Sequence, residues 1–167
     1  MKEQLYTIPV NDAFEKECEC PLCQMYDELE KESIDFMLGP SYMEDDIRMA
    51  TDKTGFCAKQ LYDGQNRLGI ALMLHTHMKH TVTQIEKLQK KSAAAKKSLF
   101  KKEISPITDY INNIEGSCYV CDRVENIFKR YITTVIHCYT HDDDFKKKFN
   151  KSNGLCTKHY GMLYEEA

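Results

Sequence analysis

The fold is decided by the stretch CYVCDRVENIFKRYITTVIHC, residues 118–138. After the cysteine pair at its start, apolar residues recur at steps of three and four, which places them on one side of a helix of about five turns. These residues are Val124, Ile127, Phe128, Tyr131, Val135 and Cys138. The stripe predicts a helix with one buried face, and within it Cys138 is predicted to be a small core residue.

Helical periodicity continues outside this stretch, whereas the alternation expected of strands is almost absent. A second long helix is predicted over about 65–91, after Gly64, with a broad apolar face. That face holds Leu68, Ala71, Leu72, His75, Met78, Val82 and Ile85. The sequence therefore predicts an all-α protein, a bundle of roughly seven or eight helices without a sheet.

A cysteine pattern occurs twice along the chain. Its first copy is Cys20-Pro21-Leu22-Cys23 followed by Gly55-Phe56-Cys57-Ala58-Lys59-Gln60, and its second is Cys118-Tyr119-Val120-Cys121 followed by Gly154-Leu155-Cys156-Thr157-Lys158-His159. The interval between the two motifs differs by one residue between the copies. The pattern predicts two tandem pseudo-repeats with one shared core, 1–91 and 103–167, joined by a lysine-rich connector, 92–102.

The second copy has the composition of a zinc site. Two cysteines separated by two residues present both sulfurs from one turn, and a further cysteine and histidine complete a tetrahedron. Here the four ligands would be Cys118, Cys121, Cys156 and His159, with Gly154 allowing a sharp turn before the last pair. The alternatives are reduced core cysteines or a thiol-disulfide couple, although that couple is expected beside a βαβ unit.

The first copy offers three matching cysteines, Cys20, Cys23 and Cys57, but Gln60 stands where the second copy has His159. An amide is a poor zinc ligand, so a second zinc site is less firmly predicted than the first. The fourth position stays open between several candidates, namely Cys18, His75, His77, His80, water or no ligand. Three protein ligands plus water is the arrangement of a catalytic zinc, so this site is also the only feature of the sequence that points to an enzyme.

Composition restricts the remaining classes of function. The chain has 167 residues and a net charge of −3, which gives no general attraction to nucleic acid. No signal peptide is recognisable, and the longest apolar run, Ile70 to Leu74, is far too short to cross a bilayer. A cytoplasmic protein without membrane contact is expected, with its eight cysteines reduced. His137 and His141, one helical turn apart, form a further pair without an evident third ligand.

The paired motifs, together with Tyr42-Met43-Glu44-Asp45-Asp46-Ile47-Arg48, resemble an uncharacterised family of bacterial cytosolic proteins. The resemblance extends over roughly residues 5–165. It implies a helical protein with two metal sites and no established activity. Members of that family usually carry histidine at the position of Gln60, and they tend to continue into a further helical segment, so a shortened chain is expected here.

These observations predict a zinc-binding helical protein that acts as a structural, interaction or regulatory module, with an unidentified protein as its partner. An enzyme is not favoured. The alternatives are a metal or thiol redox sensor, or a zinc-dependent enzyme with an open site at Cys20, Cys23 and Cys57. The oligomeric state is not predicted.

Overall fold

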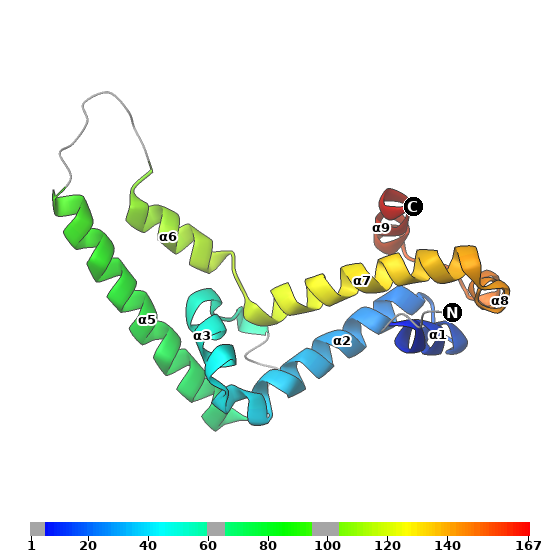
Figure 1. The fold of residues 1–167 in the computed structure, drawn as a ribbon, viewed down its shortest axis with the longest axis horizontal. Coiled ribbons are helices and arrows are strands. Elements are labelled where there is room, and N and C mark those ends of the chain that lie inside the picture. Colours follow the sequence, from blue (N-terminus) through cyan, green and yellow to red (C-terminus); the bar gives the residue numbers. More distant parts are fainter. Residues whose placement is uncertain (1–5, 60–65, 95–103) are drawn as a thin grey trace. The chain divides into compact units, whose positions relative to one another are not determined.

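The computed structural model describes residues 6–59, 66–94 and 104–167 (Figure 1). Within these ranges the chain forms eight α-helices and one 3₁₀ helix, and contains no strand, which confirms the all-α prediction. The α-helices are α1 (Thr7–Glu15), α2 (Pro21–Leu38), α3 (Asp45–Thr54), α5 (Arg67–Ala94), α6 (Pro106–Glu115), α7 (Tyr119–His141), α8 (Asp143–Lys151) and α9 (Thr157–Glu166), and the 3₁₀ helix is η1 (Pro40–Met43). The predicted starting point at Gly64, residue Gln60 and most of the predicted connector lie outside the described residues.

The chain divides into two compact units. Unit 1 consists of residues 1–32 and 123–167, and unit 2 of residues 33–122. These units do not coincide with the predicted halves 1–91 and 103–167. Each unit instead takes residues from both copies of the cysteine pattern, because the two boundaries fall inside α2 and α7, the long helices that follow the two Cys-x-x-Cys motifs.

Unit 1 is packed around the predicted apolar stripe of α7. Of the six predicted residues on that stripe, five are buried and Ile127 is partly exposed. Cys138 is 4% exposed, so its assignment to the core is confirmed. The ring of Phe14 on α1 contacts two rings of α8, those of Phe145 at 5.1 Å and Phe149 at 5.2 Å between centroids. The stripe thus forms the centre of this unit.

Unit 2 is organised by the packing of α3 against α5 (Figure 1). Thr51 on α3 is fully buried, and Met73 on α5 is 1% exposed. Asn66 fixes the start of α5, since its side-chain amide donates to the carbonyl of Leu38 and its side-chain oxygen accepts from the N–H of Gly69. This cap satisfies one of the unpaired N–H groups of the first helical turn.

The helix predicted over about 65–91 is present as α5, but the predicted buried face is wrong. Leu68, Met78 and Val82 are 66%, 64% and 54% exposed, and His75 is also exposed. The buried side instead carries Gly69 and Met73, with His77 partly buried on the same side. Gly69 lies against the cap of its own helix, since a Cβ added there would lie 2.8 Å from the side-chain nitrogen of Asn66.

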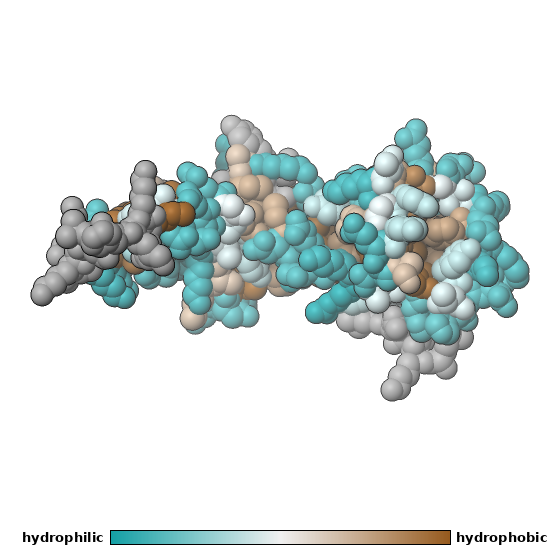
Figure 2. Space-filling view, turned by 90° about the horizontal axis from the view of Figure 1, so that it is seen from above, coloured by the Kyte–Doolittle hydropathy of each residue, from teal (hydrophilic) through white to brown (hydrophobic). Residues whose placement is uncertain are grey.

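The surface carries both hydrophobic and hydrophilic residues. Hydrophobic residues are visible among the hydrophilic ones in the space-filling view (Figure 2). Among the described residues, no helix combines the length and the apolar character that crossing a membrane requires.

Candidate metal centres

Two groups of cysteine and histidine side chains come together in the structure. We call them cluster A, formed by Cys20, Cys23, Cys156 and His159, and cluster B, formed by Cys57, Cys118 and Cys121. Within each cluster the ligand atoms all lie within 4.8 Å of one another. All atoms of cluster A belong to unit 1, and all atoms of cluster B belong to unit 2.

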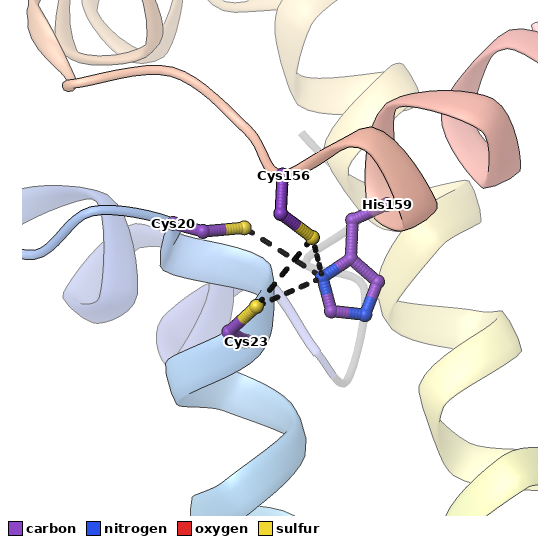
Figure 3. Close-up of side chains that lie close together, drawn as sticks. All are labelled: Cys20, Cys23, Cys156 and His159. Carbon is purple, nitrogen blue, oxygen red and sulfur yellow. Dashed lines mark hydrogen bonds between the residues drawn. The ribbon is translucent and has the colours of Figure 1, made fainter.

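Cluster A is built at two helix starts (Figure 3). Cys20 immediately precedes α2, whose first residue is Pro21, and Cys156 is the N-cap of α9. Proline suits the first helical position because that position has no intrahelical partner for an N–H. The Cys20 carbonyl accepts the backbone N–H of Cys23, which closes the turn that brings the two sulfurs to one side.

The interatomic distances in cluster A match the edges of a metal-centred tetrahedron. With Zn–S near 2.3 Å and Zn–N near 2.0–2.1 Å, a tetrahedron has S···S edges of about 3.8 Å and S···N edges of about 3.6 Å. The Cys23 and Cys156 sulfurs are 3.6 Å apart. The Nδ1 atom of His159 lies 3.6 Å from the Cys20 sulfur and 3.3 Å from each of the other two. A single ion fits at the centre of these four atoms.

The imidazole of His159 is held in place by its surroundings. It is 4% exposed, and its ring centroid lies 5.3 Å from that of Phe128 on α7. Phe128 in turn makes an edge contact with Tyr26 on α2 at 5.1 Å. Burial, followed by the charge of Lys158, lowers the pKa of His159, which favours the neutral ring, the form that a metal binds.

The thiols of cluster A differ in their readiness to ionise. Hydrogen bonds from the backbone N–H groups of His159 and, more weakly, Lys158 help lower the pKa of Cys156, as expected for a sulfur at a helix N-terminus. Burial, reinforced by the neighbouring sulfurs of Cys20 and Cys156, raises the pKa of Cys23 to about 12. Several thiolates this close repel one another, so full ionisation of the cluster requires a cation at its centre.

Cluster B has the same backbone arrangement as cluster A. Cys118 immediately precedes α7, and its carbonyl accepts the N–H of Asp122. The Cys57 and Cys121 sulfurs are 3.8 Å apart, again the edge of a metal-thiolate tetrahedron. Cys118 is buried, whereas Cys57 and Cys121 are partly exposed. Burial, followed by hydrogen bonding to Cys118, raises the pKa of Cys121 to about 12.

A turn at Gly55 brings Cys57 to the second Cys-x-x-Cys motif. The Gly55 carbonyl accepts the N–H of Tyr119 at 3.0 Å, and the Ser117 hydroxyl donates to the carbonyl of Thr54 at 2.6 Å. Gly55 has φ +67°, a value that is unfavourable for residues other than glycine. Gly154, two residues before Cys156, has φ +101°, and these two are the only residues with positive φ in the described part of the chain.

The structure brings together all seven predicted metal ligands but corrects their grouping. The predicted second-copy site of Cys118, Cys121, Cys156 and His159 does not form, and neither does the predicted open site of Cys20, Cys23 and Cys57. Each Cys-x-x-Cys motif instead faces the Gly-x-Cys motif of the other copy. A helix of 23 residues such as α7 is about 35 Å long, so it carries the chain away from the cysteines at its start.

Two of the predicted candidates for the fourth ligand, Cys18 and His75, belong to neither cluster. Cys18 belongs to unit 1, where it lines an open cavity of about 590 Å³ beside cluster A, and its carbonyl accepts from the side chain of Asn153. His75 is exposed on α5. The rings of His137 and His141 stack 4.5 Å apart at the exposed end of α7. All eight cysteines lie among the described residues, and none forms a disulfide.

The sequence profile of a family of unknown function (DUF6062) matches residues 1–167, the whole chain. The chain belongs to this family. The expected resemblance to an uncharacterised family is therefore confirmed, while the bacterial origin of DUF6062 members stays a prediction. No curated protein and no solved structure matches the chain.

Proposed function

We propose that cluster A binds one zinc ion in a structural role. The observation that carries this proposal is the agreement between four interatomic distances in the cluster, 3.3–3.6 Å, and the edges of a Cys₃His zinc tetrahedron. Burial lowers the pKa of His159, and the backbone N–H groups at the start of α9 help lower the pKa of Cys156. These features favour binding of a cation with soft and borderline ligands.

A structural role follows from the completeness of the ligand set. Four protein ligands fill a tetrahedral zinc, whereas catalytic zinc keeps one position for water or substrate. The ligands come from chain segments 133 to 139 residues apart in the sequence. Zinc at this point would join the start of α2 to the start of α9, and the binding free energy would add to the stability of unit 1.

For the cellular role we propose an interaction or regulatory module with a protein partner, placed in the cytoplasm. The proposal is supported by the four-ligand cluster A and by the eight cysteines, none of which forms a disulfide, as suits a reducing compartment. A second candidate role is a metal or redox sensor centred on cluster B. It is favoured by the partial exposure of Cys57 and Cys121, which gives the solvent access to two of its sulfurs.

Metal analysis of the purified protein tests the proposal. The wild-type chain is expected to retain at least one tightly held zinc per chain, and Cys156→Ser is expected to lose it because one ligand of cluster A is removed. Cys138→Ser is the matched control, since Cys138 is equally a thiol but lies in the core away from both clusters. Retention of the same zinc by Cys156→Ser, or a wild-type chain that binds no zinc, would contradict the proposal.

A further inference from the structure

Cluster B offers three sulfurs among the described residues, and a tetrahedral zinc requires a fourth ligand. Three histidines lie on α5, the helix packed against α3 within the same unit. His75 is exposed, and His80 is partly exposed. His77 is distinguished from both because its ring is held by a hydrogen bond to another helix.

That hydrogen bond selects the tautomer of the neutral His77 ring. Its Nδ1 atom lies 2.9 Å from the backbone carbonyl oxygen of Asp52. A carbonyl only accepts, so Nδ1 carries the proton and the lone pair of the neutral ring is on Nε2. Histidines that bind metals show this arrangement, because an N–H bonded to a backbone carbonyl orients the ring and leaves the other nitrogen for the metal.

The free nitrogen of His77 faces the turn that carries Cys57. A Cβ atom added to Gly55 would lie 2.7 Å from Nε2 and 2.8 Å from the adjacent ring carbon Cε1. The carbonyl of the same Gly55 accepts the N–H of Tyr119, the residue after Cys118. The ring of His77, the turn before Cys57 and the Cys118–Cys121 motif therefore meet around one glycine.

We propose that Nε2 of His77 is the fourth ligand of cluster B, which makes Cys57, Cys118, Cys121 and His77 a second Cys₃His zinc site. The inference rests on the proposed function, zinc binding by cysteine and histidine, and extends it from cluster A to the three thiols of cluster B. His77 lies outside the group of sulfur atoms within 4.8 Å of one another. Zinc binding at this site therefore requires a change in the side-chain torsion angles of His77 that brings Nε2 to the ion held by the three sulfurs.

The two sites would then use opposite nitrogens of their histidines, Nδ1 of His159 in cluster A and Nε2 of His77 in cluster B. This difference gives a direct test on the intact protein. Long-range ¹H–¹⁵N spectra of ¹⁵N-labelled protein loaded with two zinc ions should show one histidine with metal at Nδ1 and a second with metal at Nε2. A zinc-loaded protein in which His77 keeps the spectrum of a metal-free ring would overturn the proposal.

Variants test the same assignment through affinity. His77→Asn should weaken the second zinc equivalent by at least about tenfold and leave the first unchanged. His75→Asn and His80→Asn are matched controls on the same helix and should change neither equivalent. An unchanged affinity for the second zinc ion in His77→Asn would overturn this inference alone. Wild-type spectra in which His159 shows no metal at Nδ1 would instead overturn the proposed function of cluster A.

Discussion

Clusters A and B are formed by backbone elements of the same kind but differ in where a histidine is available. In both, a Cys-x-x-Cys motif lies at the N-terminus of a long helix and meets a cysteine that follows a glycine with positive φ. In cluster A the histidine is His159, three residues after Cys156 and on the first turn of the same helix. In cluster B the oriented histidine, His77, comes from another helix, α5.

The difference shows that one motif can take its last ligand from the local sequence or from tertiary packing. A ligand three residues away on a helix is delivered whenever the helix forms, because residues at that spacing lie on the same side. A ligand from another helix is delivered only when the two helices pack. Cluster A should therefore hold zinc more tightly than cluster B, and the following predictions test that ranking.

The largest effect is expected on removal of zinc by a strong chelator. Unit 1 should lose several kcal/mol of stability, since structural zinc sites supply apparent binding energies of about 10–16 kcal/mol in small domains. Thermal denaturation should shift to lower temperature, and hydrogen exchange should increase first at α9 and at the start of α2. A melting curve that the chelator leaves unmoved would count against a structural ion in cluster A.

The next effect compares the two histidines. His159→Gln should lower the zinc affinity of cluster A by more than about 100-fold, because it removes a buried ligand and so should exceed the 10–100-fold typical of outer-shell changes. His77→Asn should cost less at cluster B, since its ring has to rotate to reach the metal. Competition with a chromogenic chelator measures both affinities, with His137→Gln as an exposed control. Equal losses would contradict the ranking.

A rescue experiment sharpens the same comparison. Gln60 has the position in the first copy that His159 has in the second. Introducing Gln60→His into the His77→Asn background should restore the second zinc equivalent to at least its wild-type affinity, because a local ligand replaces the one lost from α5. Zinc titration of the double variant against His77→Asn alone decides this point. Failure of the rescue would show that the two copies are not equivalent at this position.

The helical fold was predictable because hydrophobic spacing alone reveals it. The predicted buried face of α7 was correct because its large apolar residues, Val124 to Cys138, form a single row, so only one side of the helix is suited to burial. On α5 the same reasoning chose the wrong side. The row containing Leu68, Met78 and Val82 is more apolar, but the buried side of the helix carries Gly69, Met73 and His77. Which side of a helix meets its neighbour depends on tertiary packing, which a hydrophobic pattern does not specify.

The residues of the clusters were likewise predictable, whereas their grouping was not. Spacing within each motif identifies Cys20, Cys23 and Cys57 as potential ligands, because that spacing is local. Which motif meets which depends on how the helices between them return, and this is a property of the tertiary structure. The length of α7 was the one available signal, since a helix of about 35 Å separates Cys121 from the segment leading to Cys156.

A smaller effect is expected from the two glycines before Cys57 and Cys156. Gly55→Ala and Gly154→Ala should both lower the free energy of unfolding by about 1–2 kcal/mol, because both have positive φ. Gly55→Ala should cost more, since its Cβ would lie 2.7 Å from Nε2 of His77, whereas a Cβ at Gly154 meets nothing within 4 Å. Urea denaturation compares the two variants. A larger loss for Gly154→Ala would contradict the contact between Gly55 and His77.

The smallest effect concerns the pH dependence of the metal-free protein. Burial lowers the pKa of His159 in the folded state below its usual value near 6.5. Below about pH 6.5 the unfolded chain therefore binds a proton that the folded chain does not, so the stability present at higher pH is lost as the pH falls through the folded pKa. Denaturant titrations of the chelator-treated protein should show a decline of at most about 1.4 kcal/mol per pH unit from this group. The decline should be smaller in His159→Gln, and an identical profile in that variant would show that His159 is not the titrating group.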